Sequence, residues 1–245
     1  VTSENFASVS RAVKIGLNDA FWAINTQALE HFSEVDPKTQ GTLEAHLIKM
    51  VKSHPKSDVR AAAINNLSLV FDQNENMASR SHIDLYSAAS EDISYIVAGD
   101  ALRALAKVQL KKAYQIATKA HSTSKKEWRE AVFYVIAKNA DPSDAKLIKD
   151  EFDRAQGFDI LDASYNLLIF LQNKTPEEYK KPLNDIYTRC ANLELWYQRY
   201  YALAMMKRQL SEMNGEFKDA VQVIFNKLID QEEDPRVLRY LGIQK

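Results

Sequence analysis

The sequence predicts an all-α fold built from helix pairs that stack one after another, and three observations support this prediction. The 245 residues include only 6 Gly and 6 Pro, so the chain has little of the turn chemistry that a sheet of many strands requires. A short apolar pattern returns along the sequence at intervals of 30 to 39 residues. Each copy falls in the second of two neighbouring segments with helical spacing of apolar residues. Such an interval holds two helices and a turn, which is typical of a helical repeat array.

The repeated pattern is an alanine, a bulky apolar residue directly after it, and a second bulky residue three positions further on. Its clear copies begin at Ala28, Ala63, Ala101, Ala131 and Ala202, and a degenerate copy begins at Ala163. The three positions lie on one face of a helix. A neighbouring helix can therefore press its backbone against the alanine while the large side chains fill the space beside it. The alternative is chance recurrence of a good helix former, which would not by itself place each copy in the second helix of a pair.

These observations predict an α-α superhelix of the HEAT or armadillo-like repeat type, with about six to seven helix pairs. We expect a single repeat domain over residues 1–245, because no composition shift or low-complexity tract divides the sequence. The chain opens without Met and directly on an amphipathic segment. We therefore expect a piece excised from a longer protein.

The first two helix pairs follow from start signals and a break. Asn18 and Asp19 are start signals for the second helix, and Asp36-Pro37 separates the first pair from the second. Asp58 provides a capping residue for the fourth helix. The expected helices cover residues 3–14, 18–32, 42–52 and 58–71.

The next three pairs contain one unusual glycine and one strong start signal. Gly99 lies in the middle of an expected helix, where Gly costs about 1 kcal/mol relative to Ala, so we interpret it as a place of close backbone contact. Asp141-Pro142 is a helix-start signal for the fifth pair. The expected helices cover residues 77–89, 92–108, 110–121, 125–138, 143–155 and 158–171.

The last helices begin at Thr175-Pro176-Glu177-Glu178. Thr175 is suited to the capping position, Pro176 to the first helical position, and the two acids to the positive end of the helix. The expected helices cover residues 175–190, 194–210, 216–229 and 235–240, and their polar last turns suit a terminal repeat.

Composition excludes several classes of protein. The formal net charge of −1 gives no overall attraction to nucleic acid or to an anionic membrane, so neither is expected as a partner. No apolar run reaches the roughly 18 residues that span a bilayer. The single cysteine, Cys190, cannot form an internal disulfide, so it leaves the compartment open between cytoplasm and periplasm.

Catalytic motifs are missing from the sequence. It contains no H-E-x-x-H, no Gly-rich phosphate loop and no C-x-x-C. The histidines have no acidic partner at a spacing that completes a zinc site, so we expect solvated or capping roles and no metal or cofactor in this chain; they are His31, His46, His54, His82 and His121. Arg189 beside Cys190 raises the alternative of a reactive thiol, but we favour a small buried core residue.

Two stretches are candidates for surface functions. Residues 107–129 contain seven basic residues and one acid, which indicates either a ridge for phosphates or an ordinary solvated face; the basic residues are Lys107, Lys111, Lys112, Lys119, Lys125, Lys126 and Arg129. The second stretch places aromatic residues on nearly all sides of one helix, more than one core face needs. Its candidate groove or interface residues are Trp196, Tyr197, Arg199, Tyr200 and Tyr201, with dense packing between helix pairs as the alternative.

The sequence also resembles one known family. Residues 17–24, LNDAFWAI, followed by Ala28-Leu29 and by residues 57–64, SDVRAAAI, resemble the C-terminal helical region of aminopeptidase N-like (gluzincin) zinc metallopeptidases of bacteria. In that family a D-x-F-W-x-I-R helix precedes an x-V-R-x-A-A helix. This chain has Asn25 where the family often has Arg. The likeness covers the first 70 residues best.

The resemblance implies a noncatalytic C-terminal domain. The family's zinc site and its G-A-M-E-N motif precede this region, so zinc is expected in a catalytic domain of the same polypeptide. The helical domain would cap that domain and restrict which peptide substrates enter an enclosed chamber. Two alternatives stay open: a stand-alone HEAT-repeat scaffold that binds a partner protein, and a HEAT-like DNA-repair glycosylase that uses the basic stretch.

Overall fold

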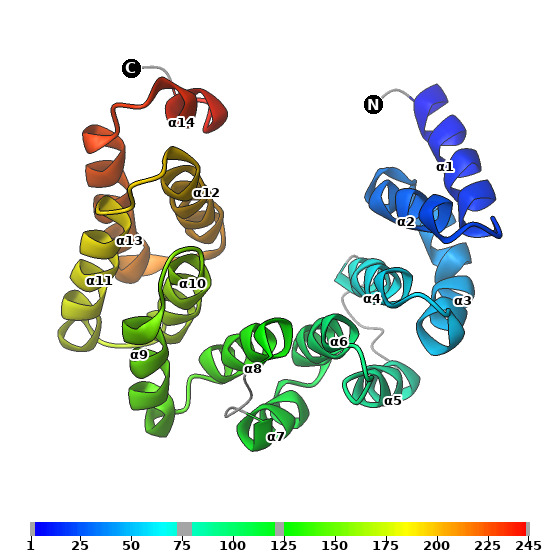
Figure 1. Ribbon diagram of the computed structural model, residues 1–245, viewed down its shortest axis with the longest axis horizontal. Coiled ribbons are helices and arrows are strands. Elements are labelled where there is room, and N and C mark those ends of the chain that lie inside the picture. The colour runs from blue at the N-terminus through cyan, green and yellow to red at the C-terminus, as the bar shows by residue number, and fades with distance from the viewer. Residues whose placement is uncertain (1–2, 73–79, 121–124, 244–245) are drawn as a thin grey trace. The chain divides into compact units, whose positions relative to one another are not determined.

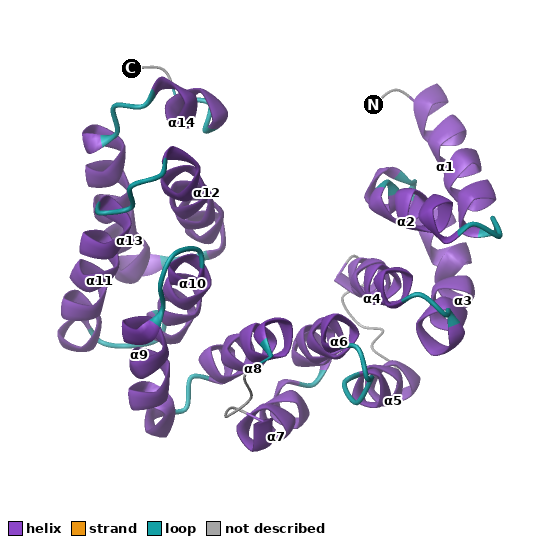
Figure 2. Ribbon diagram, viewed as in Figure 1, coloured by secondary structure: helices purple, strands orange, loops and turns teal. Residues whose placement is uncertain are grey.

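The computed structural model describes residues 3–72, 80–120 and 125–243, and these ranges contain helices and no strands (Figures 1 and 2). This confirms the predicted all-α fold of successive helix pairs. The α-helices are α1 (Ser3–Leu17), α2 (Trp22–Glu30), α3 (Pro37–Ser53), α4 (Ser57–Asp72), α5 (Arg80–Ala89), α6 (Tyr95–Val108), α7 (Leu110–Ala120), α8 (Lys126–Asn139), α9 (Ala145–Arg154), α10 (Asp159–Leu171), α11 (Pro176–Ala191), α12 (Trp196–Glu212), α13 (Gly215–Gln231) and α14 (Pro235–Tyr240).

The chain divides into two compact units, residues 1–135 and 136–245, and the boundary falls inside α8. In the first unit α1, α3, α5 and α7 are the first helices of their pairs, and α2, α4, α6 and α8 are the second. The second helices pack side by side, α2 on α4 and α4 on α6, and so form one layer (Figure 1). A single domain over residues 1–245 would require the two units to form one domain together. This stays a prediction.

The second unit repeats this arrangement. Helices α10, α12 and α14 form its layer of second helices, with α10 on α12 and α12 on α14. Helices α9, α11 and α13 pack against that layer (Figure 1). We call α2, α4, α6, α8, α10, α12 and α14 the second-layer helices.

The repeated alanine pattern lies at the centre of both units. All six copies occur in second-layer helices, and every alanine is at most 7% exposed. Ala63, Ala101 and Ala131 are completely buried, and so are the bulky residues that follow them in the pattern. The interpretation of the pattern as the packing face of a repeat is therefore correct.

Close backbone contact at Gly99 is confirmed. A Cβ atom on this residue of α6 would lie 2.9 Å from the carbonyl oxygen of Glu127 and 3.4 Å from Cβ of Ala131, both in α8. Gly16 in α1 has the same role, since a Cβ there would lie 2.8 Å from Cβ of Ala28 in α2. Neighbouring helices approach so closely at these points that only hydrogen fits.

Two helix starts differ from the prediction by more than three residues. Helix α3 begins at Pro37, earlier than expected, because Asp36 accepts a hydrogen bond from the N–H of Thr39 and caps the helix. Asp36-Pro37 is thus a start signal as well as a break. Helix α2 begins later, at Trp22, because Asp19 accepts the N–H of Phe21 (2.7 Å) in a turn before the helix. The expected helices 77–89 and 110–121 begin or end on residues outside the described ranges.

We predict opposite effects of alanine at two helical glycines. Gly99→Ala should lower the free energy of unfolding by about 1–3 kcal/mol, because the new methyl group overpacks the contact between α6 and α8. Gly41→Ala in α3 is the matched control, since nothing lies within 4 Å of its Cβ position. That change should raise stability by about 0.5–1 kcal/mol. Urea unfolding of both variants checks this, and equal effects would contradict the close contact.

Candidate interaction surface

The turns before three of the second-layer helices, α2, α4 and α12, share one polar arrangement. The side chain of the fourth residue of such a helix bonds backward to carbonyl oxygens of its own turn. It also bonds forward to a side chain in the corresponding turn of the next pair. We call each instance a rung, and the structure contains rungs at Asn25, Arg60 and Arg199. Each of these residues stands three positions before a pattern alanine.

The rung in the middle of the first unit is an ion pair. Arg60 Nη1 donates to the carbonyl oxygens of His54 (2.9 Å) and Pro55 (3.4 Å). Its Nε and Nη2 donate to the two carboxylate oxygens of Asp92 at 3.0 and 2.8 Å. Asp92 in turn accepts the N–H of Ser94 (2.8 Å). Burial alone would raise the pKa of Asp92, but the bonds from Arg60 and Ser94 hold that pKa below its ordinary value.

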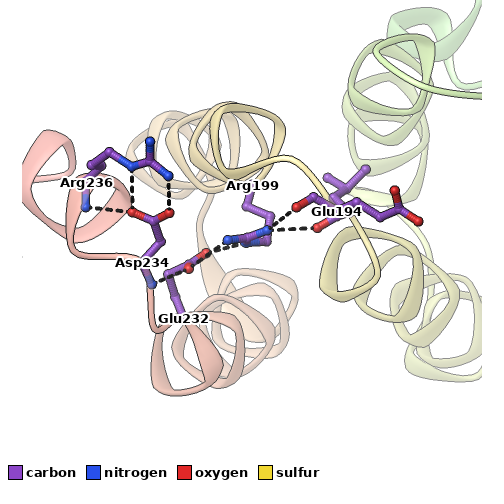
Figure 3. A network of polar contacts seen from close by, with 6 residues as sticks. Glu194, Arg199, Glu232, Asp234 and Arg236 are labelled. Carbon is purple, nitrogen blue, oxygen red and sulfur yellow. Dashed lines mark hydrogen bonds and ion pairs between the residues drawn. The ribbon is translucent and has the colours of Figure 1, made fainter.

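The rung in the second unit has the same geometry (Figure 3). Arg199 Nη1 donates to the carbonyl oxygens of Leu193 (3.1 Å) and Glu194 (2.8 Å). Its Nε and Nη2 donate to Glu232 at 2.8 and 3.2 Å. Glu232, whose side chain is only 3% exposed, accepts the N–H of Asp234 at 2.8 Å. The guanidinium thus joins the turn before α12 to the turn before α14.

The first rung has an amide and an imidazole in place of the guanidinium and the carboxylate. Asn25 Nδ2 donates to the carbonyl oxygens of Gly16 (2.9 Å) and Asp19 (3.0 Å), as the arginines do in their own turns. Nδ1 of His54 accepts the N–H of Lys56 at 3.2 Å. Its Nε2 donates to Oδ1 of Asn25 (3.2 Å), because an amide oxygen can only accept. Asn25 thus connects the two turns through an amide in place of a guanidinium.

Beside these rungs, three aromatic rings each lie under a cation from the following turn or helix. Each ring belongs to the first residue of a second-layer helix. Lys56 lies over Trp22 (5.5 Å), Lys125 over Tyr95 (5.6 Å) and Arg236 over Trp196 (4.5 Å). Such contacts are worth about 0.5–1 kcal/mol at exposed sites. They form an aromatic and cationic surface in each unit next to the buried rungs.

The second unit also carries a group of aromatic side chains in mutual contact. We call it the aromatic cluster, and its members are Phe158, Trp196, Tyr197, Tyr200, Tyr201 and Tyr240. Phe158 and Tyr197 stack with their ring centroids 5.5 Å apart. Tyr240 contacts both Trp196 and Tyr200. Phe158, Tyr201 and Tyr240 remain 44%, 52% and 58% exposed, so the rings touch each other and solvent together.

The structure separates the five predicted interface residues into two groups. Trp196, Tyr197, Tyr200 and Tyr201 lie in the aromatic cluster, whereas Arg199 belongs to a rung beneath it. Sequence reasoning missed Phe158, which directly precedes α10, and Arg236 and Tyr240 of α14. It also missed Glu232, although the spacing of 33 residues from Arg199 nearly repeats the 32 residues between Arg60 and Asp92. That spacing was the available signal.

Cys190 is placed as a core residue. It is 2% exposed, and burial raises its pKa to about 12, so the thiolate that reacts with electrophiles is scarcely populated. The neighbouring Arg189 lies over the ring of Phe152 (4.7 Å) and donates to the carbonyl oxygens of Phe152 and Ala155. Its guanidinium therefore binds the end of α9.

The described histidines have local partners. His31 bonds to Glu34 (2.8 Å), a contact that raises the pKa of His31. His46 lies 3.0 Å from the carbonyl oxygen of Leu17, at the end of α1. His82 contacts Glu44, His54 is part of the first rung, and His121 lies outside the described residues. Among the residues that the structure describes, no three His, Cys, Asp or Glu side chains form a group able to hold a metal ion.

The basic stretch lies over several elements, and acids accompany it. Its residues come from the end of α6, from α7, and from the start of α8. Lys112 lies 3.9 Å from Asp84 of α5, and Lys126 lies 3.7 Å from Glu130. These neighbouring carboxylates reduce the local positive charge below the value that the stretch alone gives.

Comparison with protein-family models finds no match for this chain, and comparison with curated proteins finds none either. None of the described helices combines the length and the apolar character needed to cross a bilayer.

We predict that the rung at Arg199 is a major source of stability. Glu232→Gln should lower the free energy of unfolding by about 2–5 kcal/mol, because it removes the anionic partner of Arg199 from an ion pair whose carboxylate is 3% exposed. Arg208→Ala in the same helix breaks an exposed pair with Glu212 and should cost less than about 0.5 kcal/mol. Urea unfolding compares the two variants. Similar small losses would mean that the rung does not hold the turns together.

We also predict a strongly acidic Asp234. This residue caps α14 by accepting the N–H of Arg236, and it binds the same guanidinium at 2.7 and 3.0 Å (Figure 3). The bonds from Arg236 lower its pKa from 3.8 to about 2. Its contribution to stability is therefore present above the ordinary value and is lost as the pH falls toward the lowered one. Arg236→Leu should return the pKa toward 3.8, while Arg239→Leu should leave it low. The carboxyl carbon shift of Asp234 in NMR titrations reports both.

Proposed function

We propose that this chain is the noncatalytic C-terminal helical domain of a bacterial zinc aminopeptidase, in which it covers the catalytic domain and restricts the access of peptides. The likeness of residues 17–24 and 57–64 to aminopeptidase N-like enzymes motivates the proposal. The exposure of large apolar side chains in the first of these motifs supports it.

Leu17 of that motif is buried in the core of the first unit, but three of its large apolar side chains are not. Phe21, Trp22 and Ile24 are 58%, 37% and 43% exposed. The polar residues Asp19 and Asn25, in contrast, are fully employed in the turn before α2. A group of large exposed apolar side chains is expected where a second protein surface covers it. The catalytic domain of the same polypeptide is the surface that the resemblance implies, and this observation carries the proposal.

The aromatic cluster would serve the peptide substrates. Tyrosine and tryptophan rings offer broad apolar faces together with polar tips, so they suit peptides of varied sequence. The rung at Arg199 fixes the helix that carries most of the cluster, since it ties the first turn of α12 to the turn before α14. Zinc and bond cleavage would belong to the catalytic domain. This chain would contribute a fixed surface that peptides pass.

The test uses the natural full-length polypeptide with its zinc. It should release N-terminal residues from peptides, and residues 1–245 alone should not. Tyr201→Ala should raise KM for long peptides about three- to tenfold, because an exposed ring contact is lost. The same variant should leave hydrolysis of an aminoacyl p-nitroanilide unchanged, since that substrate is too short to reach the cluster.

The control is Val223→Ala, which shortens a side chain that is 53% exposed on α13, outside the cluster. It should change neither substrate's kinetics. Absence of H-E-x-x-H before Val1 in the gene would refute the proposal. A stable complex with another protein, formed through the aromatic cluster by a polypeptide without that motif, would favour the alternative of a HEAT-repeat scaffold.

A further inference from the structure

The aromatic cluster of the second unit is a closed cycle of rings. Neighbouring centroids lie 5.2 to 6.2 Å apart, and each ring contacts the next in the order Phe158, Tyr197, Trp196, Tyr240, Tyr200 and Tyr201, which returns to Phe158. Two of these contacts are stacked and four are edge-on or tilted. Each ring is thus supported from two sides by geometries that aromatic pairs favour. The cycle therefore fixes the orientation of its rings.

The tyrosine hydroxyls of the cluster are available to a ligand. None of the four forms a hydrogen bond with another residue in the ranges that the structure describes; they belong to Tyr197, Tyr200, Tyr201 and Tyr240. Tyr187 of α11, in contrast, donates to Gln231 at 2.9 Å. Because Tyr201 and Tyr240 are 52% and 58% exposed, each presents an apolar face and a hydroxyl donor to the same ligand.

The guanidinium of Arg239 lies beside the cluster without an anionic partner. It is positioned over Tyr240, 5.4 Å from the ring centroid, and forms no ion pair with another described residue. Arg236 is bound to Asp234 at 2.7 Å, and Lys207 donates to the main-chain carbonyl group that follows α14 at 2.9 Å. A nucleic acid strand requires a row of cations that neutralises several phosphates. The charges therefore favour a peptide with an acidic side chain near Arg239.

These features match a peptide in the polyproline II conformation. That helix has no internal hydrogen bonds, so its carbonyl oxygens can accept from tyrosine hydroxyls, and its prolines pack on aromatic side chains at little cost in entropy. It rises about 3.1 Å per residue, which places prolines three positions apart on one face about 9 Å from each other. Two such prolines would rest on different rings of the cycle, whose neighbouring centroids are 5.2 to 6.2 Å apart.

We propose that the aromatic cluster binds proline-rich segments in the polyproline II conformation, with an acidic residue of the segment on Arg239. The prolines lie on the rings, and the tyrosine hydroxyls donate to carbonyl oxygens that the segment leaves free. Taking these segments as peptide substrates rests on the proposed function. Their binding rests on the rings, the hydroxyls and the guanidinium.

The experiment measures the fluorescence anisotropy of labelled peptides with the natural full-length polypeptide. The probe has about ten residues, prolines with glutamates at one end, and both of its termini are blocked so that no amino end is open to cleavage. A peptide with glycine and serine in place of the prolines should bind at least about tenfold more weakly, because it loses more chain entropy on binding. A peptide with lysines in place of the glutamates should bind about threefold more weakly than the probe.

Variants of the protein separate the three contacts. Tyr201→Phe keeps the ring and removes one donor, so it should weaken binding of the probe about threefold, and Tyr201→Ala should weaken it about tenfold. Arg239→Leu should abolish the preference for glutamate over lysine. Tyr95→Ala is the control, because it removes a ring of the first unit that is 43% exposed beneath Lys125 and lies outside the cluster. It should leave the affinity for the probe unchanged.

Each result decides the proposal. Equal affinity for the glycine-serine peptide, tighter binding of an oligothymidylate of similar length, or no binding of the probe would overturn it. Equal losses in Tyr201→Ala and Tyr95→Ala, or a preference for glutamate that survives in Arg239→Leu, would also overturn it. Binding as expected by a polypeptide that lacks the zinc motif would refute the proposed function and leave the binding site in place. A zinc aminopeptidase without the preference for proline would do the reverse.

Discussion

The hydrogen-bonded rung at the start of a second-layer helix is the interaction on which the rest of the arrangement depends. A turn between two helices leaves several carbonyl oxygens without helical partners, and these must be satisfied at the point where successive pairs meet. Arg60 and Arg199 do so with one guanidinium, which binds its own turn and the carboxylate of the next turn at once. The planar fork of the side chain makes this geometry possible. These contacts therefore join the turn before α2 to that before α4, the turn before α4 to that before α6, and the turn before α12 to that before α14.

The pattern of small and large residues was enough to predict the helix pairs and their packing face, because helical spacing and close approach are local properties of the sequence. Gly99 was correctly interpreted for the same reason. The partners of Arg199 were not predicted, since Glu232 and Leu193 become its neighbours only when two turns are stacked. Likewise, Phe158 contacts the aromatic cluster from the residue before α10, and Tyr240 contacts it from α14. Both are too far in sequence from α12 for helical periodicity to relate them to its aromatic residues. Sequence therefore located one helix of the surface, and tertiary packing supplied the others.

Arg199 and the aromatic residues of α12 have different roles at this surface. Arg199 is largely withdrawn into the turn, while Tyr201, two positions later, is half exposed. An aromatic surface built on a fixed helix start can contact a flexible chain without rearranging itself, which limits the entropy lost on binding. The first rung shows that the connection does not require an ion pair. Asn25 and His54 join their turns through hydrogen bonds, so added salt should affect these turns less than the turns joined by an arginine and a carboxylate.

The placement of aromatic residues at helix starts has an optical consequence. The chain has three tryptophans, and Trp22, Trp128 and Trp196 all lie in the first turn of a second-layer helix. Trp196 is in contact with a guanidinium and with Tyr240, while Trp22 is 37% exposed beneath Lys56. The tryptophan fluorescence of the protein, excited at wavelengths that tyrosine does not absorb, therefore originates at the starts of second-layer helices in each unit. Its emission wavelength and intensity report on these helix starts rather than on the buried alanine faces.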